Sequence, residues 1–314
     1  MKTKDELWNL RKIQANKIAD LYTSLGMSYE AYRIHKCATG LKFTHGFPFE
    51  EYGEIPQRLR EANFCRIRHC TICQWRRSMR WQAKAFQALP KVMHDYPSGR
   101  WLFLTLTIRN CELCNLSETI KKMNRAFKNW TQKKYWVGVG WLKSLEITRG
   151  KDNEVHPHFH VLILVKSSYF GRDYVTQKNW TKMWQKHMKL DYEPIIHISS
   201  IDAERVEKVI PEVAKYQSKP QELIDEEGAW LLGLTWEMKH HRTMNVGGVL
   251  RNYFKAADEE TDLIGESKDK MVESPIKSDW IWDEEEGYRK CYTFDGKEID
   301  TEEAIENFIQ WTGA

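Results

Sequence analysis

The 314-residue chain has no run of 18 apolar residues and no apolar signal core near Met1, so we expect a soluble, unexported protein of one or two domains with no membrane partner. Seven cysteines, an odd number in a long chain, argue against a secreted disulfide framework and favour the cytoplasm. Residues 1–150 contain 27 Lys and Arg against 12 Asp and Glu, which suits a polyanion partner, whereas residues 258–314 contain 6 against 18.

The N-terminal segment has apolar residues at helical spacing over residues 5–35. This pattern predicts one helix and, after Gly26, a second over residues 27–34. Together with the cysteine block that follows, residues 1–95 are expected to form a helical N-terminal region with a zinc-binding element.

Four cysteines in this region have the spacing of a metal site. A Cys-x2-Cys pair is preceded by two further cysteines, and four thiolates complete a tetrahedral zinc site. The predicted ligands are Cys37, Cys65, Cys70 and Cys73. His35 or His69 in place of one cysteine, a competing pair at Cys111 and Cys114, and buried free thiols are the alternatives.

Basic residues crowd the last three of these cysteines, as expected of a zinc knuckle that lies on a phosphate backbone. The predicted DNA contacts here are Arg66, Arg68, Arg76 and Arg77. A helix is expected over residues 76–86, ended soon afterwards by Pro90.

The middle of the chain alternates between strand and helix patterns. Residues 101–108 form a β pattern with Thr105 and Thr107 on one face, which are further candidate DNA contacts. A helix over residues 117–134, two strands, a helix over 174–188, a strand over 194–200 and a last helix follow. This order predicts an α+β fold, a ferredoxin-like or RRM-like antiparallel sheet with helices on one face, spanning residues 96–257.

Three histidines in the run His-Pro-His-Phe-His at residues 156–160 open an apolar strand. His158 and His160 share one face of that strand, and neutral imidazoles suit a divalent cation. If the preceding turn centres near Asp152, Glu146 lies opposite His158 and supplies a third ligand. The simpler interpretation of Glu146 is a solvated glutamate on an exposed strand.

A second group of reactive side chains follows Pro211. Between Pro211, which suits a first helical position, and Pro220, four residues fall on one face of a predicted helix: Glu212, Lys215, Tyr216 and Lys219. The lysines favour the phenolate of the tyrosine and attract phosphate, which makes it a candidate nucleophile. The alternative is a surface helix with an ordinary ion pair.

These motifs give the chain a family resemblance. Residues 103–107, 156–160 and 215–219 resemble the three ordered motifs of HUH endonucleases, and the cysteine block is similar to that of replication initiators of small bacterial rolling-circle plasmids. The resemblance implies a single-tyrosine nickase and strand transferase of the plasmid origin. It also implies Mg²⁺ or Mn²⁺ on His158, His160 and Glu146, attack by Tyr216 to give a 5′-phosphotyrosine and a 3′-OH primer, and a second cleavage by water that Glu212 activates.

The resemblance further implies origin DNA, single-stranded or as a hairpin, a host helicase and a host DNA polymerase as partners, and a homodimer in some members. Two other classes fit part of the sequence. One is a histidine-triad nucleotide hydrolase, and the other is a non-catalytic zinc-containing protein that binds single-stranded nucleic acid. Residues 258–314 are expected to form an acidic linker and a C-terminal tail, some of which packs through aromatic residues.

Overall fold

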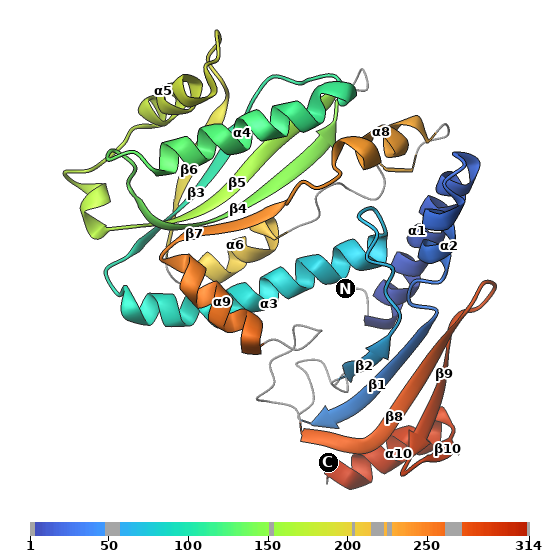
Figure 1. Cartoon of the computed structure of the whole chain (residues 1–314). Coiled ribbons are helices and arrows are strands. Elements are labelled where there is room, and N and C mark those ends of the chain that lie inside the picture. Colours follow the sequence, from blue (N-terminus) through green and yellow to red (C-terminus); the bar gives the residue numbers. More distant parts are fainter. Residues whose placement is uncertain are drawn as a thin grey trace. The chain divides into compact units, whose positions relative to one another are not determined.

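The computed structural model of the chain (Figure 1) describes residues 4–47, 57–150, 154–202, 205–214, 223–224, 228–260 and 272–312. It divides into two compact units, the first made of Met1–Arg80 with Thr261–Ala314 and the second of Trp81–Glu260. Of the residues expected to form the acidic linker and C-terminal tail, 261–314 therefore belong to the same unit as the N-terminal region, and 258–260 belong to the second unit. None of the helices in these ranges is long and apolar enough to cross a bilayer.

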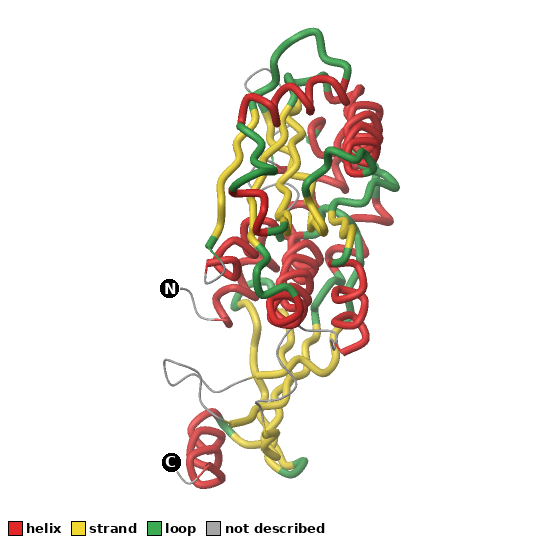
Figure 2. Tube along the Cα trace, turned by 90° about the vertical axis from the view of Figure 1, so that its left-hand side faces the viewer, coloured by secondary structure: helices red, strands yellow, loops and turns green. Residues whose placement is uncertain are grey.

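The first unit contains a five-stranded antiparallel sheet in the order β10-β9-β8-β1-β2. The strands are β1 (Gly40–Phe47), β2 (Gln57–Ala62), β8 (Val272–Asp283), β9 (Gly287–Phe294) and β10 (Lys297–Ile299). The helices are α1 (Lys4–Ser24), α2 (Ser28–His35) and α10 (Thr301–Thr312), with the start of α3 (Thr71–Asp95). Helix α10 lies beside β8 and β9 (Figure 2). The two predicted N-terminal helices are confirmed as α1 and α2.

Strand β8 shows how part of the acidic C-terminal segment packs, as its aromatic residues predict. Its side chains alternate, with Ile276, Ser278 and Trp280 buried and the charged Lys277 and Asp279 exposed. A charge on every second residue is compatible with a half-buried strand. The Trp280 ring packs 4.6 Å from that of Phe43 on β1 and closes the core of the first unit.

Helix α3 continues through Pro90, so the prediction that the helix ends near this proline is wrong. Proline in a helix interior costs about 3 kcal/mol because it removes one backbone hydrogen bond. Leu89 and Val92, on either side of Pro90, are fully buried in the core of the second unit, and their packing offsets that cost.

The second unit contains the predicted sheet, in the order β6-β3-β5-β4-β7, with every pair antiparallel. The strands are β3 (Arg100–Thr107), β4 (Gly138–Arg149), β5 (Val155–Val165), β6 (Ile196–Ile201) and β7 (Met244–Gly248). The helices are α4 (Leu116–Thr131), α5 (Gln177–Met188), α6 (Val206–Val213), α8 (Ala229–Glu237) and α9 (Leu250–Glu260), with 3-10 turns η1 (Leu113–Asn115) and η2 (Ser167–Phe170). The α+β class and the predicted order of elements are confirmed, whereas the edge strand β7 was not predicted.

Helices pack on both faces of this sheet, which differs from the expected arrangement on one face. On one face, Phe159 of β5 packs against Phe127 of α4 and Trp184 of α5. On the other face, Leu162 and Leu164 belong to a core that α3, α6 and α9 complete. The histidines of β5 share this second face but lie nearer its N-terminal end, so apolar packing occupies one end of the face and the polar site occupies the other.

Candidate functional site

Three buried polar side chains form a cluster on β4 and β5, two strands that lie side by side in Figure 1. Glu146 pairs with His158 across the two strands, in the predicted register. The Glu146 Oε2 atom lies 3.0 Å from His158 Nε2 and 2.8 Å from His160 Nε2. The side chains of Glu146, His158 and His160 are only 7%, 12% and 8% exposed, so the interpretation of Glu146 as a solvated surface glutamate is wrong.

The second nitrogen of each imidazole also has a partner. His158 Nδ1 lies 3.3 Å from the backbone oxygen of His156, and His160 Nδ1 lies 3.3 Å from the Thr105 hydroxyl. Metal-binding histidines generally carry such a contact on the nitrogen that faces away from the cation, because it fixes the ring and its tautomer. The Phe103 ring stacks on His160 at 5.6 Å and further restricts that ring. The three side chains therefore offer donor atoms close enough together to hold one metal ion.

Further polar groups lie next to this cluster, on the neighbouring strand β3 and on residues just outside the strands. Thr107 pairs with His158 in the sheet and donates a hydrogen bond of 2.6 Å to the backbone oxygen of Ile195. His156 Nδ1 lies 2.9 Å from the Asn110 side-chain oxygen. Burial, followed by the neighbouring His158, lowers the pKa of His156 and so favours the neutral form of this ring.

The predicted nucleophile helix is only partly described. Glu212 lies exposed on α6, whereas Lys215, Tyr216 and Lys219 lie outside the described residues. The prediction that the helix starts at Pro211 is wrong, because α6 begins at Val206 and contains Pro211. Its early start is explained by Val206 and Ile210, which are buried in the core of the second unit.

The four cysteines predicted to bind zinc come together in the first unit, and all four are buried. The sulfur of Cys73 lies 3.6 Å from those of Cys37 and Cys65, and the Cys37 and Cys70 sulfurs are 3.7 Å apart. Four thiolates held 2.3 Å from a tetrahedral zinc ion are about 3.8 Å apart, so these residues fit that ion.

The other ligand sets considered for this cluster do not match the structure. In the described part of the chain, Cys111 and Cys114 belong to neither group of metal-ligand side chains. The His35 ring contacts Asp20 at 3.2 Å, and His69 is not a member of the four-residue group.

Hydrogen bonds to Cys73 favour the negatively charged form of this thiol. The backbone N–H of Arg66 donates to Cys73 Sγ at 3.3 Å, and Arg66 adopts a left-handed conformation with φ of 60°. Hydrogen bonds from Cys37, Cys65 and Cys70, with a further contribution from the Arg66 N–H, lower the pKa of the Cys73 thiol. These contacts therefore favour a thiolate at Cys73, the form that binds metal, whereas hydrogen bonds with the neighbouring thiols raise the pKa of Cys37 and of Cys70.

A buried lysine beside this cluster was missed by the sequence reasoning. Lys12 of α1 is fully buried, and its Nζ donates to the backbone oxygen of His35 at 2.6 Å. Burial lowers the pKa of Lys12, while the charges of Cys37 and Cys70 act in the opposite direction. The available signal was its place on the apolar stripe of α1, four residues after Trp8.

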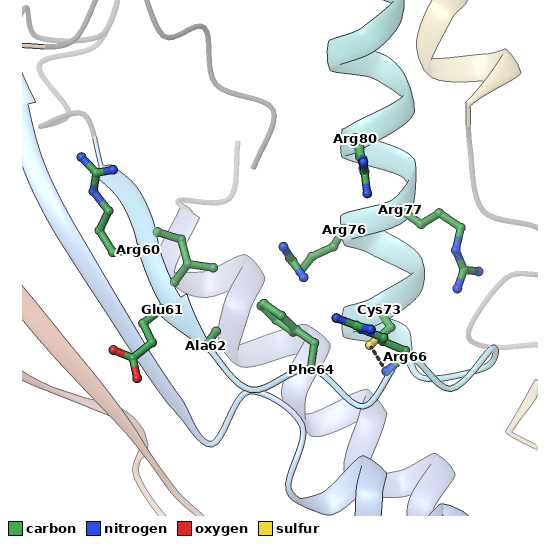
Figure 3. A pocket seen from close by; sticks show the side chains of 10 residues that line it. Arg60, Glu61, Ala62, Phe64, Arg66, Cys73, Arg76, Arg77 and Arg80 are labelled. Atoms are coloured by element: carbon green, nitrogen blue, oxygen red, sulfur yellow. Dashed lines mark hydrogen bonds between the residues drawn. The ribbon is translucent and has the colours of Figure 1, made fainter. Parts of the chain in front are cut away.

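A cavity of about 610 Å³ in the first unit is lined by basic side chains (Figure 3). Its charged lining residues are Arg60, Arg66, Arg76, Arg77, Arg80 and Glu61. Three of these arginines were predicted DNA contacts, whereas Arg60 and Arg80 were not predicted. Arg68, also predicted, does not line this cavity, and burial followed by the charge of Arg77 lowers its pKa to about 10.

Comparison with known proteins gives a consistent result. The family model described as "Replication protein" matches residues 56–290. The chain is 34% identical over 282 residues to "Protein rep" of Streptococcus pneumoniae serotype 2, with 85% of each chain covered. It is 33% identical over 280 residues to "Protein rep" of Bacillus amyloliquefaciens (79% of this chain and 81% of the relative). For "Protein rep" of Lentilactobacillus hilgardii the identity is 30% over 285 residues (85% and 88%). No solved structure matches the chain significantly.

Proposed function

Because this chain belongs to the replication protein family, we propose that it initiates rolling-circle replication of a plasmid by nicking one strand of the origin DNA. The observation that carries this proposal is the convergence of Glu146, His158 and His160 on adjacent strands. The likeness of residues 103–107, 156–160 and 215–219 to the ordered HUH motifs supports the same reaction.

Glu146, His158 and His160 are proposed to hold Mg²⁺ or Mn²⁺. Adjacent ligands of an octahedral ion at about 2.1 Å lie about 3.0 Å apart, close to the 2.8 and 3.0 Å separations of the donor atoms here. When bound, the cation withdraws charge from the oxygens of the scissile phosphate. Two imidazole donors favour Mn²⁺ over Mg²⁺ in affinity.

The proposed nucleophile is Tyr216. Its phenolate oxygen forms a bond to the scissile phosphorus while the bond from phosphorus to the 3′ oxygen breaks, and that oxygen takes a proton to become the 3′-OH primer. Lys215 and Lys219 are proposed to attract the phosphate and favour the phenolate. The ester to the tyrosine conserves the energy of the broken bond, so strand rejoining needs no nucleotide cofactor.

A second cleavage must end each round of replication. We assign it to a water molecule that gives its proton to Glu212, attacks the phosphorus at the second cut and releases the 3′ oxygen of that strand as a hydroxyl. Because Glu212 lies in α6 and is exposed, it is accessible to solvent water.

The remaining proposals concern where DNA binds, the other partners of the protein and its cellular compartment. In the second unit, the DNA would lie along the polar end of the sheet face, where Thr105 and Thr107 adjoin the histidines. The arginines of the first unit are proposed to contact DNA phosphates as well. The four cysteines are proposed to hold Zn²⁺. The proposed partners are origin DNA as a single strand or hairpin, a host helicase, a host polymerase and a second copy of the chain. The compartment is the cytoplasm.

The test uses a labelled single-stranded oligonucleotide that carries the plasmid's own origin, incubated with the full chain and Mn²⁺. The wild-type protein is expected to retain the label covalently in denaturant. Tyr216→Phe should bind the oligonucleotide and form no adduct, whereas Tyr174→Phe, which removes an exposed hydroxyl elsewhere in the second unit, should behave as wild type.

Two results would contradict the nickase. A wild-type protein that binds the oligonucleotide and never forms an adduct would favour the non-catalytic binding protein. Cleavage of an adenosine phosphoramidate that persists in Tyr216→Phe would favour a histidine-triad hydrolase.

A further inference from the structure

The space in the first unit that is lined by the five arginines and Glu61 is called the arginine cavity. Contacts with neighbouring side chains hold some of its arginines in defined positions. The Arg76 guanidinium lies 3.5 Å from the centre of the Phe64 ring, so the ring fixes its plane. Arg60 Nε donates to the Thr44 hydroxyl at 3.2 Å. Figure 3 shows Arg76 and Arg80 on successive turns of α3, with Arg66 beside Cys73 on the loop that leads into this helix.

The positive charge of the arginine cavity favours an anionic ligand. Five arginines line it against one carboxylate, and that carboxylate, Glu61, is paired with Lys42 at 2.9 Å. Arginine presents a planar fork of donors that matches a phosphate group. The arginines come from β2, the loop after it and α3, so they surround the space from more than one side.

The size and apolar lining of the cavity restrict which anion fits. Leu59, Ala62 and Phe64 line it together with the arginines. A volume of about 610 Å³ lies within the ~300–1,000 Å³ range of pockets that enclose one small ligand, which suits one or two nucleotides and not a duplex. Proteins that bind unpaired strands combine basic grooves with aromatic side chains in this way.

We propose that the arginine cavity binds one or two nucleotides of an unpaired DNA strand, with phosphate on Arg66, Arg76 and Arg80 and a base against Leu59 and Phe64. This site belongs to the first unit, whereas the proposed cutting residues belong to the second. The choice of DNA as the ligand rests on the proposed function.

The cysteine cluster positions this site. Cys73 itself lines the cavity, Arg76 follows it by three residues on α3, and the Arg66 N–H donates to Cys73 Sγ. Metal on the cysteines would therefore hold Arg66 and Arg76 at a fixed separation, and the two sites form one DNA-holding element.

The test measures binding separately from cutting. The zinc-loaded full chain, with no added Mg²⁺ or Mn²⁺, is titrated into labelled single-stranded and duplex oligonucleotides between 50 and 200 mM salt. The Arg76→Ala/Arg80→Ala variant is expected to lose about tenfold or more in single-strand affinity. Its slope of log affinity against log salt should fall in magnitude by about 1.4, because each lost single-strand phosphate contact contributes about 0.7.

Controls and outcomes separate this proposal from the nickase. Arg289→Ala removes an exposed arginine of the same unit that pairs with Asp283, and it should bind as wild type. If the double variant misfolds by circular dichroism or loses zinc, Arg80→Ala alone, at an exposed residue, is used and should lower the slope by about 0.7. Unchanged affinity and slope, or an equal loss on duplex, would overturn the proposal even if the covalent adduct forms. The expected loss supports it even if no adduct forms.

Discussion

Glu146 lies directly opposite His158 in the antiparallel pair of β4 and β5, and its carboxylate contacts the imidazoles of both His158 and His160. This contact depends on the register of the hairpin. A shift of one residue would move every side chain of β4 to the other face of the sheet, where Lys143 now lies against α4. The turn between the strands therefore determines whether the cluster exists.

Replacing this carboxylate tests the metal proposal. Glu146→Gln keeps the shape of the side chain and removes its charge, so the affinity for Mn²⁺ should fall by about 100-fold or more, since even outer contacts of a metal site are worth 10–100-fold. Free Mn²⁺ measured by electron paramagnetic resonance gives the affinity without reference to activity. Glu118→Gln, an exposed carboxylate on α4, is the control and should bind Mn²⁺ as wild type. Equal Mn²⁺ affinity in all three proteins would exclude Glu146 as a ligand.

The cysteine cluster predicts a loss of zinc on substitution. Cys37→Ser leaves three thiolates, so purified protein should contain well below one zinc per chain, and the first unit should unfold at a lower temperature. Zinc content by atomic absorption and a thermal melt measure the two effects. Cys291→Ser, which alters an exposed thiol on β9 of the same unit, should change neither. Full zinc occupancy in Cys37→Ser would show that this thiol is not a ligand.

The assignment of Glu212 predicts a change of product. Glu212→Ala should still form the covalent adduct at the first cut, because the nucleophile proposed for that step is Tyr216. The water-dependent second cleavage should slow by about 10²–10⁴-fold, the usual contribution of a general base. Gel analysis of the products over time should therefore show accumulation of the adduct. A normal rate of second cleavage in this variant would assign the base to another group.

The hairpin and the cysteine cluster could be predicted from the sequence because their signals are local. The sequence at Gly150 and Asp152 predicts a turn between two β patterns, and a turn there places Glu146 opposite His158, the pairing that the structure has. The spacing of Cys70 and Cys73 indicates a metal site without knowledge of the fold.

Other features depend on contacts between distant segments. Strand β8 pairs with β1, so Trp280 lies opposite Leu41 although 239 residues separate them, and no periodicity in either segment identifies the other. The same holds for β7, whose Gly247 pairs with Trp141 of β4. The helix through Pro90 is likewise explained by core packing and not by local propensity.

Lys143 gives a prediction about the pH dependence of stability. It is a buried cation on β4 that donates to the Asn124 side-chain oxygen and lies 3.7 Å from the centre of the Phe159 ring. Burial lowers the pKa of Lys143 from 10.5 to about 7. Between these values the unfolded chain binds one proton more than the folded chain, so the free energy of unfolding rises with pH. The part of the free energy of unfolding that depends on Lys143 is fully present above pH 10.5 and is lost as the pH falls to 7.

Lys143→Met should remove this dependence. Chemical denaturation between pH 7 and pH 10 should show the free energy of unfolding of the wild type rising by up to about 1.4 kcal/mol per pH unit more than that of the variant. The comparison of slopes matters because Met also deprives Asn124 of its donor, which shifts the absolute stability by an amount independent of pH in this range. Lys122→Met, at an exposed position on α4, should keep the wild-type slope. Parallel curves for wild type and Lys143→Met would mean that Lys143 titrates near its ordinary value in the folded protein.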